Sequence, residues 1–179
     1  MTEEAIKFMR SVPAPLGVVS VAGLYRTGKS YLLNRMLLNT NKPKQGFGVG
    51  PTINPCTKGL WCWGTPIKGK SQNGESINII VIDTEGIGAL DEDQTHDTRI
   101  FTLAILASSC FIYNSTGSID ETAVQNLSLV VNLTKHIQLK STNKTYDDEE
   151  NADEMAHYFP TFYWVVRDFS LKLQDVQGN

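Results

Sequence analysis

An eight-residue segment near the N-terminus, GLYRTGKS from Gly23 to Ser30, has the spacing of a phosphate-binding P-loop. Its glycines allow the backbone to curl so that N–H groups point at phosphate oxygens, and a following helix adds the positive end of its dipole. The Lys29 ammonium would reach the terminal phosphates, and the Ser30 hydroxyl would ligate Mg²⁺. The pattern arises by chance in only about 0.01 chains of this length. It therefore predicts a nucleoside triphosphate site rather than a simple glycine-rich turn.

An acidic motif, Asp83-Thr-Glu-Gly86, follows the second buried apolar run of the chain. The Asp83 carboxylate could hold Mg²⁺ mostly through water, and the Gly86 N–H could meet the γ-phosphate. Alone, such a motif is usually a turn. Placed one crossover after a P-loop, it predicts the magnesium and γ-phosphate segment of a nucleotide hydrolase.

The long loop at 42–57 offers one further candidate ligand. Thr57 could bind Mg²⁺ through its hydroxyl and the γ-phosphate through its backbone. Thr52 competes for this role, and a threonine with no role beyond the loop remains the alternative.

The base of the nucleotide is harder to identify from the residues. Arg167 and Asp168 follow an apolar run, and a carboxylate there could accept hydrogen bonds from both N1–H and the 2-amino group of guanine. Adenine presents N1 as an acceptor, so Asp168 would select guanine. A surface ion pair is an equally good interpretation of this dipeptide. The segment 143–147, NKTYD, has one residue too many between its lysine and its aspartate to match the usual guanine motif, Asn/Thr-Lys-x-Asp.

Arg26 lies inside the P-loop, where many P-loops have a small or neutral residue. An arginine there could stabilise the charge of the transition state, as an arginine finger supplied by the same chain. A solvent-facing arginine is the alternative, and position alone does not decide between the two.

Length and composition limit the remaining possibilities. The chain has 179 residues, of which 41% are hydrophobic and 20% charged, with a net charge of −3. These values fit one globular domain and exclude wholesale disorder and general electrostatic binding of nucleic acid. No apolar stretch approaches the ~18 residues of a membrane span. The three cysteines include no Cys-x-x-Cys pair, and the histidines (His96, His136 and His157) lack metal-ligand spacing and are predicted to have no role.

Strands and helices are predicted to alternate along the chain. Apolar runs predict strands at 16–22, 60–64, 77–82, 109–113 and 162–166, and helical periodicity predicts helices at 31–38, 98–107 and 121–133. A hairpin turn is expected at 68–75, an irregular acidic segment at 84–97 and a mobile acidic loop at 141–157. This order predicts an α/β fold of the P-loop NTPase type, a mainly parallel sheet between two layers of helices. Ligands of such sheets bind at the carboxyl ends of strands, where all the candidate residues lie.

Several of these segments together resemble the large GTPase domain of guanylate-binding proteins, a branch of the dynamin superfamily. The resemblance covers roughly 16–173 and rests on GLYRTGKSYLLNRML, VGPTINPCTKGLWCWGTPI, VIDTEGIGALD, FTLAILASSCFIYNSTGSIDETAVQNL and HYFPTFYWVVRDFSL. It implies that Arg26, Lys29, Thr57 and Glu85 are catalytic, and that Ser30, Thr57 and Asp83 bind Mg²⁺. The implied nucleotide-binding residues are Gly23, Leu24, Tyr25, Arg26, Thr27, Gly28, Lys29, Ser30, Tyr31, Thr57, Asp83, Gly86, Arg167 and Asp168.

The resemblance also implies properties of the whole protein. Members bind and hydrolyse GTP, some of them to GMP, and form nucleotide-dependent homodimers through the GTPase face. Residues 1–179 would be the N-terminal portion of one large GTPase domain, incomplete at its C-terminus. We expect a cytoplasmic protein that reaches membranes only through regions beyond this chain.

One position departs from the family pattern. Members often carry a serine two residues before the switch I threonine, where it helps to position the attacking water, whereas this chain has Pro55. We expect GTP hydrolysis to persist but to be slower than in serine-bearing relatives. Single-turnover rates of Pro55→Ser would test this, and no gain in rate would count against it. Two alternatives stay open: a nucleotide-dependent assembly module with poor turnover, and an ATP-using P-loop kinase, against which Asp168 argues.

Overall fold

The computed structural model of the chain describes residues 2–40, 45–50, 57–71, 73–88, 94–119, 121, 124, 125, 128 and 159–170. Several sequence predictions lie outside these residues and stay predictions. They concern Thr52 and Pro55, most of the helix at 121–133, and the acidic loop at 141–157.

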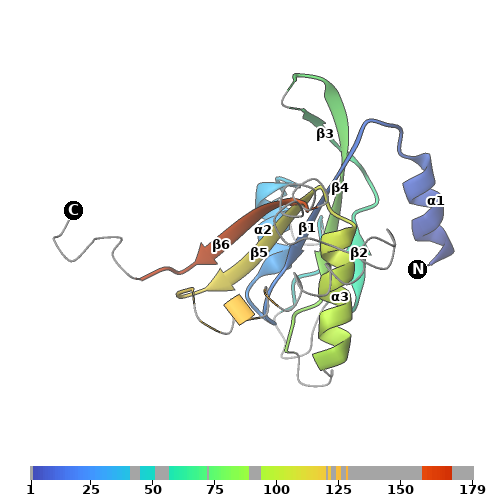
Figure 1. Cartoon of the computed structure of the whole chain (residues 1–179). Coiled ribbons are helices and arrows are strands. Elements are labelled where there is room, and N and C mark those ends of the chain that lie inside the picture. The colour runs from blue at the N-terminus through green and yellow to red at the C-terminus, as the bar shows by residue number, and fades with distance from the viewer. Residues whose placement is uncertain are drawn as a thin grey trace, which may run out of the picture.

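A six-stranded sheet forms the centre of the molecule (Figure 1). Its order is β2-β4-β1-β5-β6, with β3 pairing with β4 beside this path. Strands β4, β1, β5 and β6 run parallel, whereas β2 and β3 are antiparallel to β4. The predicted α/β fold with a mainly parallel sheet is therefore confirmed. The strands are β1 Leu16–Ala22, β2 Leu60–Cys62, β3 Ile67–Lys70, β4 Ser76–Thr84, β5 Cys110–Thr116 and β6 Thr161–Arg167.

Two helices cover opposite faces of this sheet (Figure 1). Helix α2 (Lys29–Met36) packs Leu33 against Val21 and Val81. Helix α3 (Gln94–Leu106) packs Phe101 against Ala22 and the rings of β5 on the other face. Successive residues of a strand point to opposite faces. The neighbours Val21 and Ala22 therefore belong to different core clusters, one on each face of the sheet. The three-layer arrangement follows directly from the apolar run of β1.

The register of β1 against β4 determines where the polar residues meet. Leu16 is paired with Asn78 and Val21 with Asp83. Because the two strands are parallel, both end at the same edge of the sheet. The segment after Ala22 and the acidic residue of β4 are therefore neighbours.

An N-terminal helix, α1 (Glu3–Ser11), was not predicted from the sequence. Its signals are nevertheless present: the Thr2 hydroxyl accepts from the Ala5 N–H at 3.3 Å, two acids lie in the first turn, and Arg10 lies in the last. It contributes no buried residue and lies at the margin of the molecule (Figure 1).

Other differences concern the ends of elements. Residues 67–70 pair as a strand, so the expected hairpin turn is confined to the residues around Gly74. Helix α3 begins at Gln94, inside the segment that was expected to be irregular. No helix within the described part of the chain is long and apolar enough to cross a membrane.

Candidate functional site

The P-loop connects the end of β1 to the start of α2, as the sequence predicts. Gly28 caps α2 with a φ of 80°, a left-handed conformation that strains other residues. A Cβ at this position would also overlap the guanidinium of Arg167. The left-handed φ favours glycine at position 28, whereas the end of the flexible arginine could move aside.

The Leu24 carbonyl accepts several hydrogen bonds from within the P-loop. The Leu24 oxygen accepts from the Thr27 hydroxyl at 2.8 Å, from the Thr27 N–H at 3.4 Å and from Lys29 Nζ at 3.1 Å. Lys29 is only 6% exposed, and this burial lowers its pKa to about 8 against the opposing attraction of Asp83 and Glu85. The Lys29 ammonium thus lies inside the site rather than in solvent, and its burial disfavours the charged form.

The side-chain oxygens of three residues meet at the carboxyl ends of β1 and β4. Oδ2 of Asp83 accepts from the Ser30 hydroxyl at 2.5 Å and from the Thr57 hydroxyl at 3.1 Å. Oδ1 of Asp83 is buried and has no hydrogen-bond partner. Burial raises the pKa of Asp83, although both hydroxyls and the Lys29 charge oppose the shift. The predicted trio Ser30, Thr57 and Asp83 is therefore brought together, from three segments of the chain.

These oxygens suit a hard divalent cation. Mg²⁺ prefers one or two carboxylates completed by hydroxyls, waters and phosphate oxygens. The unpartnered Oδ1 of Asp83 is an acceptor that such an ion, or a water bound to it, would satisfy. No group of three or more His, Cys, Asp or Glu side chains able to hold a metal occurs among the residues that the structure describes. The site thus fits a metal held jointly with a phosphate ligand.

The segment after β4 is paired with the P-loop. The Tyr25 N–H donates to the Ile87 carbonyl at 2.9 Å, and the Ile87 N–H donates to the Gly23 carbonyl at 3.1 Å. Gly86 lies so close to the backbone of Tyr25 that a Cβ would overlap it. The backbone N–H of Gly86 is therefore held beside the loop that would receive phosphates.

Glu85 makes contacts that the sequence did not reveal. One carboxylate oxygen accepts from the Gly59 N–H at 2.5 Å, and the other is hydrogen-bonded to His96 Nε2. The prediction that His96 has no role rested on spacing alone. The contact depends on α3 returning over the end of β4, which no local pattern encodes.

Arg167 is the last residue of β6, one residue beyond the end predicted for this strand, and Asp168 follows it. The arginine side chain is turned toward the P-loop. Arg167 Nη1 donates to the Thr27 carbonyl at 2.9 Å, and its guanidinium lies 5.7 Å from the ring centre of Tyr31. The buried Asn114 donates to the same carbonyl at 2.9 Å, a second contact that the sequence did not suggest. Asp168 is exposed, with a φ of 54°.

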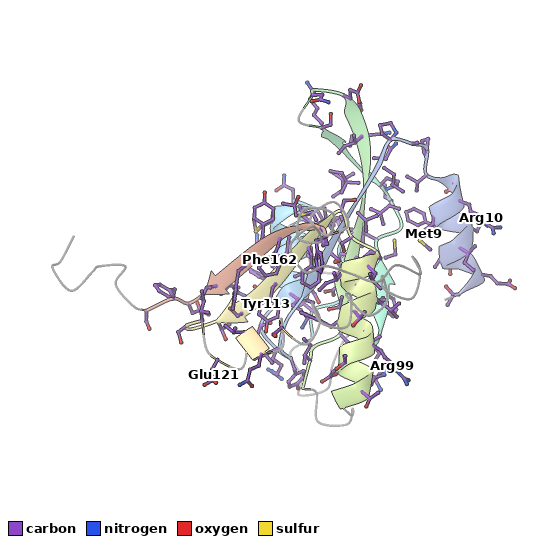
Figure 2. All side chains as sticks on the ribbon, viewed as in Figure 1. Met9, Arg10, Arg99, Tyr113, Glu121 and Phe162 are labelled. Atoms are coloured by element: carbon purple, nitrogen blue, oxygen red, sulfur yellow. The ribbon has the colours of Figure 1, made fainter. Side chains whose placement is uncertain are left out.

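Arg167→Ala is expected to lower the free energy of unfolding of the nucleotide-free chain by about 1–2 kcal/mol. It removes one of two donors to the Thr27 carbonyl and the stacking on Tyr31. Urea unfolding measures the change. Arg99→Ala is the control, because Arg99 projects from α3 away from the sheet (Figure 2) and should matter by no more than about 0.5 kcal/mol. Equal stabilities of the two variants would contradict the contact.

The amino-acid sequence matches that of a known protein family. The family model for the N-terminal domain of guanylate-binding proteins matches residues 1–178. The chain belongs to the guanylate-binding protein family. It is 42% identical over 172 residues to guanylate-binding protein 3 of Homo sapiens, covering 96% of this chain and 27% of that protein. It is 41% identical to guanylate-binding protein 1 of Chlorocebus aethiops over 172 residues, covering 96% of this chain and 28% of that protein.

Guanylate-binding protein 7 of Mus musculus is 39% identical over 175 residues, which cover 97% of this chain and 26% of that relative. The chain thus spans about a quarter of the length of these curated relatives. The site described above therefore lies in the N-terminal domain of a guanylate-binding protein.

Proposed function

We propose that this chain binds GTP with Mg²⁺ and hydrolyses it to GDP and phosphate. The observation that carries the proposal is the convergence of Lys29, Ser30, Thr57 and Asp83 at one edge of the sheet. Membership of the family supports guanine nucleotide as the ligand.

Each residue would have a distinct task. The N–H groups of the P-loop and the Lys29 ammonium would bind the phosphates, and Ser30, Thr57 and Asp83 would hold Mg²⁺. When bound, Mg²⁺ neutralises charge on the phosphate oxygens. Glu85 lies beside Gly86 and would orient the attacking water by accepting its hydrogen bond. Arg26 would stabilise charge that develops on the transferred phosphoryl group.

Asp168 would read the base through paired hydrogen bonds to guanine. Because Arg167 donates to the carbonyl of Thr27, the guanine-reading pair is linked to the P-loop by a direct contact. Occupancy of the base site would then favour the phosphate-binding conformation of the loop.

A nucleotide-dependent assembly module with poor turnover is the second candidate. It is favoured by exposed apolar side chains on the segments that border the site, namely Leu24, Tyr31 and Trp61. Such a surface could form a homodimer contact through the GTPase face.

Titration of the chain with GTP, GDP, GMP and ATP in the presence of Mg²⁺ tests the proposal. We expect GTP to bind at least about 100-fold more tightly than ATP, because adenine leaves the Asp168 carboxylate unpaired. Phosphate release separates a hydrolase from an assembly module, and light scattering reports dimers. Equal affinities for ATP and GTP would contradict the assignment of guanine.

A further inference from the structure

The carboxylate of Glu85 joins two segments that come from opposite sides of the site. Oε2 accepts from the Gly59 N–H at 2.5 Å, and the Glu85 N–H donates to the Gly59 carbonyl at 2.9 Å. Gly59 follows Thr57 by two residues. Glu85 therefore fixes the end of the loop that carries the Thr57 hydroxyl.

The first turn of α3 holds the same acidic segment at two points. His96 Nε2 is hydrogen-bonded to Oε1 of Glu85, and Oδ2 of Asp97 accepts from the Gly88 N–H at 2.6 Å. The helix thus approaches both sides of Gly86. Of these two contacts, the one made by Asp97 reaches a backbone N–H. The one made by His96 reaches the Glu85 carboxylate, which can accept a hydrogen bond from water.

The two partners differ strongly in exposure. The Glu85 side chain is 9% exposed and that of His96 is 38% exposed. A half-exposed imidazole contributes little to folding, because solvent competes for its hydrogen bond. The imidazole thus lies on the solvent side of a carboxylate that is itself nearly buried.

We propose that His96 is a positioning residue for GTP hydrolysis. It holds Glu85 in the conformation that accepts from Gly59 with one oxygen and contacts His96 with the other. This inference rests on the proposed function, in which Glu85 orients water. In this role His96 acts through Glu85 rather than on the nucleotide itself. A carboxylate free to rotate would misplace the water, and an error of about 1 Å can cost 100-fold in rate.

Three variants test the role. His96→Ala removes the donor, and His96→Gln keeps a donor at similar reach. Arg99→Ala is the matched control on the same helix, where the side chain projects away from the sheet (Figure 2). We expect His96→Ala to slow single-turnover hydrolysis by about 10- to 100-fold while the Kd for GTP changes by less than about twofold. His96→Gln should recover most of the rate, and Arg99→Ala should match wild type.

A second measurement does not need nucleotide. The Gly59 amide is hydrogen-bonded to Glu85, so its hydrogen exchange reports whether the carboxylate is in place. We expect exchange at Gly59 to be at least about tenfold faster in His96→Ala and near wild type in His96→Gln. Unchanged exchange at Gly59, or a His96→Ala rate within twofold of wild type, would overturn the proposal. A wild-type chain that binds no GTP would refute the proposed function and the catalytic part of this inference, while Gly59 exchange would still decide whether His96 positions Glu85.

Discussion

Arg26→Ala is expected to slow GTP hydrolysis by at least about 10³-fold while GTP affinity stays within about threefold of wild type. An arginine that stabilises transition-state charge contributes about 10³ to 10⁵ in rate. It contributes little to ground-state binding, because the charge it meets develops only during the reaction. The effect should therefore appear in the rate of the chemical step and not in the Kd.

The backbone at this position supports a functional reason for the residue. Arg26 has a φ of 61°, and its guanidinium lies 5.9 Å from the ring centre of the preceding tyrosine. A left-handed conformation costs a residue with a Cβ about 1 kcal/mol or more, whereas glycine adopts it freely. Retaining an arginine at a position that suits glycine is consistent with a role for its side chain. Arg26→Ala keeps the same strained backbone, so it isolates the loss of the guanidinium.

Single-turnover phosphate release at saturating GTP and Mg²⁺ measures the prediction. Arg26→Lys keeps the charge but not the planar fork of donors, and should recover only part of the rate. Arg10→Ala is the control, since Arg10 lies on α1 at the margin of the molecule (Figure 2). A rate for Arg26→Ala within threefold of wild type would show that the arginine acts elsewhere.

Most of the elements, and the meeting of the candidate magnesium-binding side chains, could be predicted from the sequence because their signals are local. The valine-rich run of β1 and the glycines of the P-loop specify a strand, a turn and a helix within 21 residues of chain, 16–36. The meeting of Ser30 with Asp83 also follows, because parallel strands bring their carboxyl ends to one edge of the sheet. Asp83 comes from a segment far along the chain, yet the parallel pairing of β1 with β4 is enough to place it.

Contacts that depend on how helices and side chains return to the sheet could not be predicted. His96 meets Glu85 only because α3 passes over the end of β4, and the spacing of histidines carries no trace of this. Arg167 reaches the Thr27 carbonyl from a segment 140 residues away in the chain, so its orientation toward the P-loop is a tertiary property. The dipeptide is visible in the sequence, but the direction of its arginine side chain is not.

Lys29→Met is expected to weaken GTP binding by about 100-fold and, at the same time, to stabilise the nucleotide-free chain. The first effect follows from the loss of charge-assisted hydrogen bonds to the phosphates, which are worth about 1.5–3 kcal/mol. The second follows from the burial of Lys29, which lowers its pKa from 10.5 to about 8. At neutral pH the charged lysine is more favourable in the unfolded chain, where water solvates it, than in the folded chain, where it is buried. Its charge therefore lowers the free energy of unfolding.

The pH dependence of stability distinguishes this cause from a packing effect. Between pH 8 and 10.5 the unfolded lysine keeps its proton while the folded one releases it, so the unfolded state binds more protons. Wild-type stability should therefore rise with pH across this window, and that contribution should be absent from Lys29→Met. The full penalty below pH 8 is on the order of 3 kcal/mol. We expect a gain of about 1–2 kcal/mol at pH 7, because Asp83 and Glu85 also lose a nearby positive charge.

The contacts of Lys29 allow the substitution without a new unsatisfied group. Its ammonium donates to the Leu24 carbonyl, which still accepts from the Thr27 hydroxyl at 2.8 Å after the change. Urea unfolding at pH 7 and at several values up to 10.5 measures the effect, with the exposed Lys7→Met on α1 as control. A Lys29→Met chain less stable than wild type at pH 7 would mean that Lys29 holds the P-loop together. The expected result would mean instead that the loop retains a buried cation at a cost to stability, as a site built to receive phosphate requires.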